Sequence, residues 1–359
     1  MTLSLCMIVK NEQDVLERCL LSVKGVFDQI IIVDTGSSDN TIKIAEKYAD
    51  IVSHFDWQDD FSAARNYSFS LASTDYIMWL DADDVLSPEN RLALIQLKSS
   101  LNGSADAYFL RYDAAFDEYG NVSLFYYRER IFKRLSGFVW EGEIHEAVSV
   151  YGNLVYSDIA ITHLRQTKQE RNFRNLLFFL KGFLNGKTPD ARGQFYFARE
   201  LVDHGLYNLA ASVFTSFLSN ENGWSENKIC ACRDLAFCYK MLGNRDKRRQ
   251  ALFLSFSFGS PRPDICCDIG EFYFEIQDFK HAVFWYKLAA NEPQNGQNGA
   301  FVVPDYYGFI PYMWLCVCFD KLGNFEKARF YNDLAGKIKP YDKNYLHNKL
   351  YFDSFMNKG

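Results

Sequence analysis

Short apolar runs alternate with segments of helical periodicity over the first ninety residues, and this alternation limits the fold more than any other feature. The apolar runs lie at residues 3–9, 29–33, 51–55 and 76–80. Helical patterns fill the intervals between them, at 12–23, 39–48 and 61–72. Continuous apolar runs are typical of strands covered on both faces. The pattern therefore predicts an α/β unit with a mostly parallel sheet.

Residues 108–163 are richer in β-branched and aromatic residues, and glycines interrupt them. The runs lie at 108–112, 124–127, 148–150 and 159–162. They predict antiparallel or mixed strands added to the parallel core, so we expect the first domain to cover 1–165. The charged residues Arg165, Lys168, Arg171 and Arg174 follow, and they predict a connecting helix over 166–190 with a solvated face.

Residues 191–359 repeat a short motif. The segment 205–210 (GLYNLA) is echoed at 323–328 (GNFEKA), at 277–282 (QDFKHA) and, in degraded form, at 243–248 (GNRDKR). Positions 207, 245, 279 and 325 lie 38, 34 and 46 residues apart. A period of about 34 residues is typical of stacked helix-turn-helix units. The tail resembles tetratricopeptide repeats, with a loop over 291–305.

Composition excludes several classes of protein. The chain has 359 residues, 48% apolar and 23% charged, so it is neither a small disulfide scaffold nor largely disordered. Its 39 basic and 45 acidic residues give a net charge of −6, which disfavours a nucleic-acid partner. The longest apolar run, 312–319, is far shorter than the roughly 18 residues that span a membrane. Nine cysteines, mostly in apolar helical stretches, fit reduced thiols, and we expect a cytoplasmic protein without a transmembrane segment.

Polar and acidic residues directly follow three of the predicted strands. They form the segments 10–12 (KNE), 34–39 (DTGSSD) and 81–84 (DADD). Carboxyl ends of parallel strands meet at one edge of a sheet, where α/β proteins bind ligands, so we expect the three segments to converge there.

Two interpretations fit the segment 81–84. If it is extended, Asp81 and Asp83 point the same way and can share Mg²⁺ or Mn²⁺ with the phosphates of a substrate, while Ala82 leaves the approach open. Alternatively, Asp83 or Asp84 caps the helix that begins near Pro88.

The segment 34–40 is similarly ambiguous. Asp34, at the end of a buried strand, can accept a hydrogen bond from the imide of a uracil. Alternatively, Gly36 turns the chain and Ser37 or Ser38 caps a helix that carries Asp39 in its first turn.

Four ordered motifs, at 4–12, 31–41, 60–66 and 79–84, resemble those of family 2 glycosyltransferases. The chain is similar to the branch with a helical-repeat tail, which includes lipopolysaccharide-core transferases and sublancin-type transferases that glycosylate peptide cysteine. The resemblance is close over 3–165 and extends to the tail in character only. It implies a GT-A fold, a UDP-sugar donor, a divalent metal (Mn²⁺ or Mg²⁺) and inversion at the anomeric carbon.

The resemblance also implies roles for individual residues. It places uridine near Ile8, Lys10 and Glu12, with Asp34 on the uracil. The diphosphate or donor sugar would face Arg65 and Asn66. The residues implied in donor binding are thus Ile8, Lys10, Glu12, Asp34, Arg65, Asn66, Asp81, Ala82 and Asp83. The implied metal ligands are Asp83 and His163, with Asp81 beside the ribose and the metal.

The segment 140–146 (WEGEIHE) resembles a further motif of this branch, and Ile161-Thr162-His163 resembles its metal-ligand histidine. Leu164 and Arg165 stand where the family usually has glycine and tyrosine. An acceptor hydroxyl must lose a proton as it attacks, and Glu146 is our candidate general base, with His145 orienting or replacing it.

The sequence therefore predicts an enzyme that moves a hexose or N-acetylhexosamine from a UDP-sugar to a hydroxyl or thiol of a peptide, protein or glycan. Two alternatives remain open. One is a catalytically inactive interaction protein built on the repeats. The other is a phosphatase in which Asp81 is the nucleophile and Asp83 the acid. The tail is expected either to recognise the acceptor along its concave face or to form a homodimer.

Overall fold

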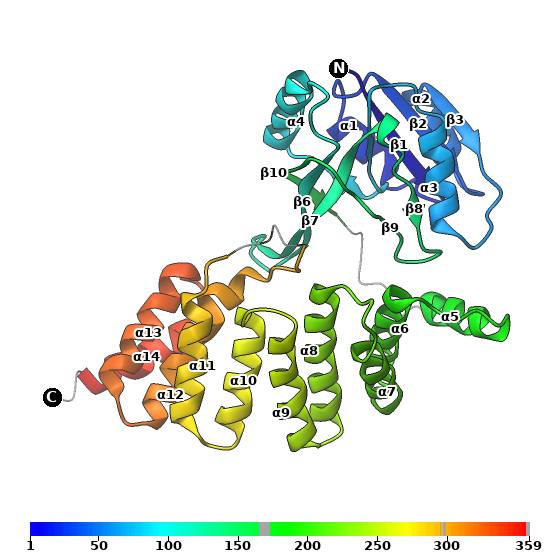
Figure 1. Cartoon of the computed structure of the whole chain (residues 1–359). Coiled ribbons are helices and arrows are strands. Elements are labelled where there is room, and N and C mark those ends of the chain that lie inside the picture. The colour runs from blue at the N-terminus through cyan, green and yellow to red at the C-terminus, as the bar shows by residue number, and fades with distance from the viewer. Residues whose placement is uncertain (165–172, 295, 297–298, 357–359) are drawn as a thin grey trace. The chain divides into compact units, whose positions relative to one another are not determined.

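The computed structural model describes residues 1–164, 173–294, 296 and 299–356 (Figure 1). The chain divides into two compact units: Met1–Glu170 with Gly296–Phe301, and Arg171–Asn295 with Val302–Gly359. Arg165, Lys168 and Arg171, which the sequence places at the start of the connecting helix, lie outside the described residues.

A mixed eight-stranded sheet forms the centre of the N-terminal unit, with strand order β3-β2-β1-β4-β7-β6-β10-β5. β1, β2, β3 and β4 are mutually parallel, β7 is antiparallel to β4 and β6, and β10 is parallel to β6. This confirms the predicted parallel core with added mixed strands. The strand bounds are β1 (Leu3–Val9), β2 (Gln29–Asp34), β3 (Ile51–His54), β4 (Tyr76–Trp79), β5 (Asp84–Val85), β6 (Ala107–Phe116), β7 (Val122–Lys133) and β10 (Leu154–His163).

Helices cover both faces of this sheet. The helix bounds are α1 (Leu16–Ser22), α2 (Thr41–Tyr48), α3 (Phe61–Ser70) and α4 (Pro88–Ser100). On β1, Leu5 and Met7 pack with α1, α2 and α4, whereas Cys6 packs on the opposite face with side chains of α3. A short turn, η1 (Arg134–Ser136), follows β7, and β8 (Trp140–Glu141) pairs with β9 (Ala147–Val148) as a separate ribbon.

Two of the three predicted helices begin later than the sequence predicts, whereas α3 begins at Phe61 as expected. The helix expected from residue 12 starts at Leu16, because residues 12–15 form a turn closed by the N–H of Val15 bonding to the carbonyl of Glu12. The helix expected from residue 39 starts at Thr41, so Asp39 lies before its first turn.

Both capping interpretations are wrong. The N-cap of α2 is Asn40, and the Ser37 hydroxyl accepts the N–H of Asn11 instead of capping a helix. The cap of α4 is Ser87, whose hydroxyl accepts the N–H of Asn90. Asp39 instead accepts the N–H of Thr41, the first residue of α2, and Gly36 turns the chain at a φ of 103°, as expected.

The register of the sheet brings the polar segments together. Val9 lies opposite Asp34, and Asp34 opposite His54. β10 runs in the same direction as β4, and its last residue, His163, pairs with Asp84. The carboxyl ends of β1, β2, β4 and β10 therefore meet at one edge, as expected for an α/β ligand site.

The second unit consists of successive helix pairs: α6 with α7, α8 with α9, α10 with α11, and α12 with α13 (Figure 1). This confirms the predicted all-helical tail. The bounds are α5 (Arg174–Leu184), α6 (Ala191–Asp203), α7 (Tyr207–Leu218), α8 (Ser225–Met241), α9 (Arg245–Leu254), η2 (Ser255–Ser257), α10 (Pro263–Glu275), α11 (Phe279–Asn291), η3 (Pro304–Tyr307), α12 (Phe309–Lys321), α13 (Phe325–Ile338) and α14 (Lys343–Met356).

The repeated motif forms the turn within each pair. Its first residue has a positive φ in all four copies: 75° at Gly205, 70° at Gly243, 62° at Gln277 and 73° at Gly323. Glycine adopts this conformation without a steric cost, so only the third copy carries local strain. The motif's last residue is a fully buried alanine in three copies and Arg248 in the degraded one.

Candidate active site at the strand ends

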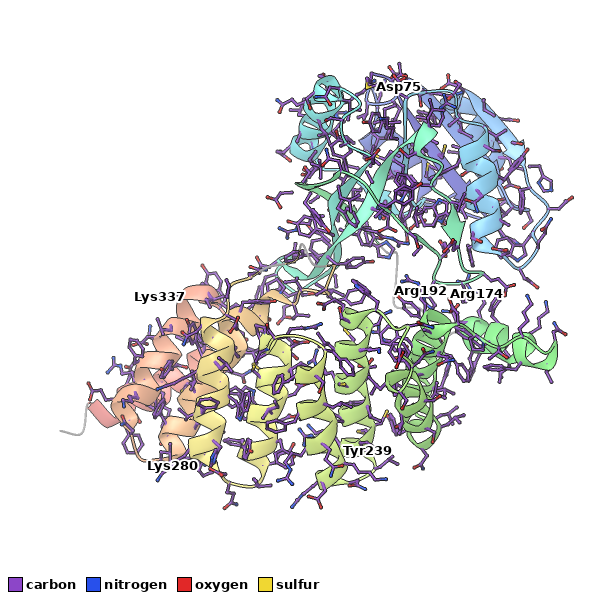
Figure 2. The ribbon with its side chains drawn as sticks, viewed as in Figure 1. Asp75, Arg174, Arg192, Tyr239, Lys280 and Lys337 are labelled. Carbon is purple, nitrogen blue, oxygen red and sulfur yellow. The ribbon has the colours of Figure 1, made fainter. Side chains whose placement is uncertain are left out.

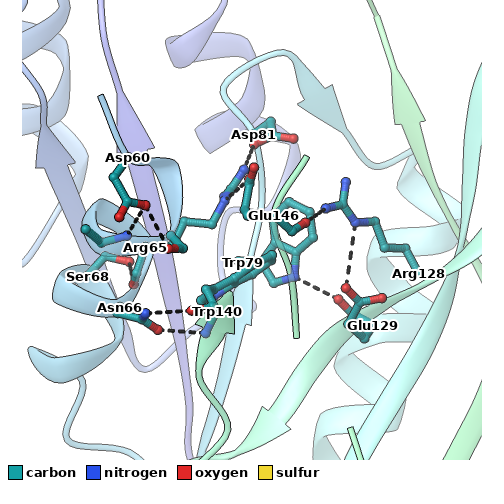
Figure 3. Close-up of polar contacts among 12 residues, drawn as sticks. Asp60, Arg65, Asn66, Ser68, Trp79, Asp81, Arg128, Glu129, Trp140 and Glu146 are labelled. Atoms are coloured by element: carbon teal, nitrogen blue, oxygen red, sulfur yellow. Dashed lines mark hydrogen bonds and ion pairs between the residues drawn. The ribbon is translucent and has the colours of Figure 1, made fainter. Parts of the chain in front are cut away.

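Arg65 lies at the centre of the candidate site. It projects from α3, whose N-cap Asp60 accepts the N–H of Ala63, and it is 6% exposed. Its Nε donates to Oε1 of Glu146 at 2.7 Å, and its Nη2 donates to Oδ1 of Asp81 at 2.8 Å (Figure 3). One buried cation therefore joins the strand-end acid to the candidate base.

A buried tryptophan supports this arrangement. Trp79 is fully buried, and its indole N–H donates to the carbonyl of Glu129 at 2.8 Å. The guanidinium carbons of Arg65, Arg128 and Arg130 lie 4.5, 4.5 and 3.8 Å from the centroid of its ring. The ring thus holds three cations at the site through cation–π contacts.

The segment 81–84 is a turn rather than an extended strand, since the N–H of Asp84 bonds to the carbonyl of Asp81 at 3.1 Å. The side chains of Asp81 and Asp83 consequently take different partners. Asp81 binds Arg65, whereas Oδ1 of Asp83 lies 3.4 Å from Nδ1 of His163. The expected convergence of Asp81 and Asp83 on one ion is therefore corrected: ligand atoms within 4.8 Å of one another belong to Asp83, Asp84 and His163.

Asp84 is the buried member of this group and is held by hydrogen bonds inside the unit. It is fully buried and accepts hydrogen bonds from Nη1 of Arg130 at 3.0 Å, the Tyr112 hydroxyl at 2.9 Å and the N–H of Asp81 at 3.0 Å. Its carboxylate is therefore already neutralised. Asp83 and His163, whose side chains are 27% and 22% exposed, are the members that a ligand can reach.

The titratable groups show an excess of negative charge. Burial and the charges of Asp83 and Asp81 raise the pKa of Glu12 to about 7. Contact with the carboxylates of Asp83 and Asp84 raises the pKa of His163 to about 9, against the effect of its burial. Burial also acts to raise the pKa of Asp81, but the charges of Arg65 and Arg130 outweigh it and hold that pKa below its usual range. Such an environment favours a bound cation.

Asp83, Asp84 and His163 suit a metal ion by their chemistry, but only two of the three are available as ligands. Two carboxylates and an imidazole supply oxygen and nitrogen atoms, and oxygen-rich sets suit Mg²⁺ or Mn²⁺. Because Asp84 is engaged by Arg130 and Tyr112, Asp83 and His163 are the available ligands. Two protein ligands leave positions for the phosphates of a substrate.

The loops after β1 and β2 bind each other beside this group. Asn11, at φ 56°, donates its N–H to the hydroxyl of Ser37, and its side-chain oxygen accepts the N–H of Ser38 at 2.8 Å. Asp34 is 3% exposed and accepts the N–H groups of Gly36 and Ser37. Ile8 is half-buried at the end of β1, whereas Lys10 is exposed.

Two of the expected donor residues have structural tasks. Both ends of the Asn66 amide bond to the backbone of Trp140, at 2.9 and 2.8 Å, and fix β8 beside α3. Ala82 is 5% exposed and packs in the main core of the unit. Neither side chain adds a free polar group at the strand ends.

The loop 142–146 carries the candidate base. His145 has a φ of 55°, so the loop turns sharply just before Glu146. Glu146 is 8% exposed, its carbonyl accepts from Nη2 of Arg128 at 3.3 Å, and the carbonyl of Glu143 accepts the N–H of Phe61. These bonds tie the loop to β7 and to the start of α3.

Comparison with known proteins finds similarity to glycosyltransferases and to repeat proteins. Residues 4–152 match the family model described as glycosyl transferase family 2. The chain is 29% identical over 212 residues to the SPbeta prophage-derived glycosyltransferase SunS of Bacillus subtilis. This alignment covers 56% of this chain and 49% of SunS. It is 48% identical over 99 residues to a TPR repeat-containing protein of Synechococcus elongatus, which covers 28% of this chain and 24% of that protein.

A solved structure, S. aureus TarS 1-349 in complex with UDP, is 15% identical with a TM-score of 0.38, and the match covers 70% of this chain and 90% of that one. The matched stretches span less than half of either curated relative. The match to a glycosyltransferase model over residues 4–152 confirms the transferase class that the motifs predict. Among the described residues, no helix has both the length and the apolar character needed to cross a membrane.

Proposed function

We propose that the chain transfers a hexose or N-acetylhexosamine from a UDP-sugar to an acceptor, with inversion at the anomeric carbon and with a divalent cation. The observation that carries this proposal is the pairing of Asp83 with His163 at 3.4 Å beside a buried Arg65 that bridges Asp81 and Glu146. A cation site and a candidate base thus share one edge of a family 2 domain.

Asp83 and His163 would hold the cation, Mn²⁺ or Mg²⁺. Bound there, the ion would neutralise the charge that gathers on the leaving diphosphate. The half-buried Glu12, whose pKa is raised to about 7, lies close enough to Asp83 and Asp81 to share their field. Binding of a cation relieves repulsion among these three carboxylates.

The uridine is assigned to the loops after β1 and β2. Ile8 offers an apolar contact, Lys10 a positive charge, and Asp34 a carboxylate for the uracil imide. Asp34 already accepts two backbone N–H groups, so its remaining lone pairs would serve the base. Arg128, which is 23% exposed on Trp79, adds a cation that the diphosphate can approach.

Glu146 is assigned as the general base. Oε1 is bound to Arg65, while Oε2 makes no hydrogen bond to any described residue. A carboxylate held at one oxygen keeps the other in place for the acceptor proton. His145, which directly precedes Glu146, would orient Glu146 or replace it as the base. A thiol acceptor, with an unperturbed pKa of about 8.5, would depend on this base less than a hydroxyl does.

The acceptor is proposed to be a peptide, protein or glycan bound by the helical unit, and the setting is proposed to be the cytoplasm. All nine cysteines lie within the described residues and are free thiols, eight of them buried, as suits a reducing compartment. Self-association through the helical unit remains a second proposed role of the repeats.

Turnover of UDP-sugars tests the proposal. Purified full-length protein is incubated with UDP-glucose, UDP-N-acetylglucosamine and UDP-galactose in Mn²⁺, and released UDP is measured. We expect release from at least one donor, a loss of about 100-fold in Asp83→Asn, and no change in Asp246→Asn. Asp246 is a matched control because its side chain is 87% exposed on α9. Failure to release UDP from all three donors, or full activity in Asp83→Asn, contradicts the proposal.

A further inference from the structure

An open cavity of about 470 Å³ lies wholly within the helical unit, between the segment that leads into α6 and the loop that joins α7 to α8. Its volume falls within the roughly 300–1,000 Å³ of small-molecule sites. Nothing in the transfer mechanism uses it. The lining residues are Pro189, Asp190, Ala191, Arg192, Gln194, Phe217, Asn220, Asn222, Trp224 and Asn227.

The lining combines apolar surface with several polar side chains and carries no dominant charge. One acidic and one basic residue, Asp190 and Arg192, line the cavity, and Arg192 lies in the first turn of α6 (Figure 2). Carboxamides supply the remaining polar groups. Each amide can both donate and accept, which matches the hydroxyl groups of a neutral polyol better than the charge of a phosphate. A phosphate would also meet the Asp190 carboxylate.

Asn227 is the buried polar anchor of the cavity. It is 6% exposed and lines the cavity, yet its side chain makes no hydrogen bond to any part of the chain that the structure describes. Because its amide atoms remain accessible to water from the cavity, a hydrogen-bonding partner can reach them there. A ligand hydroxyl in the cavity would supply that partner.

Trp224 provides an aromatic wall. It precedes α8 in a non-helical conformation and remains 49% exposed. Tryptophan side chains are highly buried on average in folded proteins. The loop lies tightly beneath it, because a side chain on Gly223 would meet Lys228 and Phe217 at 2.8 and 3.0 Å. Phe217 is fully buried and closes the floor.

We propose that this cavity is a saccharide-binding subsite that takes a neutral mono- or disaccharide. The C–H face of a sugar ring stacks on Trp224, and its hydroxyls bond to Asn227 and the neighbouring amides. Sugars present both an apolar C–H face and polar hydroxyls, and the cavity offers an aromatic ring for the first and amides for the second. Its further role, holding the glycan part of an acceptor, rests on the proposed function, whereas saccharide binding itself does not.

Ligand-detected NMR on the full chain tests the subsite without donor or metal. The probes are glucose, galactose, mannose, N-acetylglucosamine, lactose and cellobiose. We expect saturable binding of at least one, weakened by about tenfold in Trp224→Ala and in Asn227→Leu. Phe330→Ala is the matched control, because it removes a 57% exposed aromatic from α13, outside the cavity, and should leave binding unchanged.

Absence of binding by all six saccharides overturns the subsite, and so does binding in Trp224→Ala that equals the wild type. The second result would place the sugar elsewhere on the chain. The two proposals fail separately. Loss of UDP release with saccharide binding retained contradicts only the transferase proposal, while UDP release without saccharide binding contradicts only this one.

Discussion

Nε of Arg65 donates a 2.7 Å hydrogen bond to Oε1 of Glu146, so a helix residue and a loop residue 81 positions later share one buried ion pair. The same guanidinium binds Asp81 at 2.8 Å and lies over Trp79. Arg65 therefore sets the positions of both Asp81 and the candidate base Glu146. A change in Arg65 should alter both at once.

Arg65→Ala should lower the free energy of unfolding by about 3 kcal/mol, because it leaves the buried Glu146 and the partly exposed Asp81 without their cation. Arg65→Lys should recover part of the stability but little activity, since an ammonium cannot reproduce two directed bonds. Urea unfolding and UDP release measure the two effects. Wild-type unfolding of Arg65→Ala would show that the bridge contributes nothing.

The adjacent aspartates should respond differently to the same substitution. Asp84→Asn should destabilise the fold by about 3 kcal/mol, because it leaves Arg130 fully buried and without its counter-charge. Asp83→Asn should cost less stability, because Asp83 is partly exposed and pairs only with His163, but it should lose Mn²⁺ binding. Thermal unfolding with and without Mn²⁺ separates them. Equal behaviour of the two variants would contradict the division between ligand and support.

Without metal, stability should fall as the pH rises. The pKa of His163 is raised from 6.5 to about 9, so its contribution is fully present below pH 6.5 and is lost as the pH passes through about 9. Glu12, with its pKa raised from 4.5 to about 7, acts in the same direction over a lower range. Urea unfolding across this range measures the slope. His163→Gln should remove the step near pH 9, and persistence of that step would assign it to another group.

Metal affinity should depend on pH in the opposite sense. His163 must lose its proton before it can bind a cation, so Mn²⁺ should bind more tightly as the pH rises towards 9. Titration calorimetry in two buffers of different ionisation enthalpy would detect the released proton. Binding that releases no proton would remove His163 from the ligand set.

Gln277→Gly should stabilise the helical unit by about 0.5–1 kcal/mol, because glycine adopts a φ of 62° without steric cost. The converse control is Gly243→Gln, at the equivalent turn with φ 70°, which should destabilise by a similar amount. Thermal unfolding of both variants provides the comparison. If both substitutions shift stability in the same direction, the equivalence of the turns is wrong.

The sequence predicted the parallel core, the mixed strands and the helical repeats because each follows from local periodicity. It also indicated that 10–12, 34–39 and 81–84 follow neighbouring strands, which the register of β1, β2 and β4 confirms. It could not give the conformation of 81–84, since one backbone hydrogen bond decides between a turn and an extended segment.

The arginine cluster was missed, although a signal existed. Arg128 and Arg130 are two apart and directly follow the predicted strand 124–127, and residues two apart in an extended segment point to the same side. What periodicity cannot give is their shared partner, because Trp79 lies on another strand. Asn66 shows the reverse case: the resemblance placed it on the donor, but its amide is occupied by Trp140.

Binding of UDP measured by titration calorimetry, with and without Mn²⁺, tests the central claim most directly, because it needs neither the correct sugar nor the acceptor. We predict binding that requires Mn²⁺, is lost in Asp83→Asn and is retained in Asp246→Asn. Equal binding of UDP without the metal, or undiminished binding in Asp83→Asn, would contradict the account of this site.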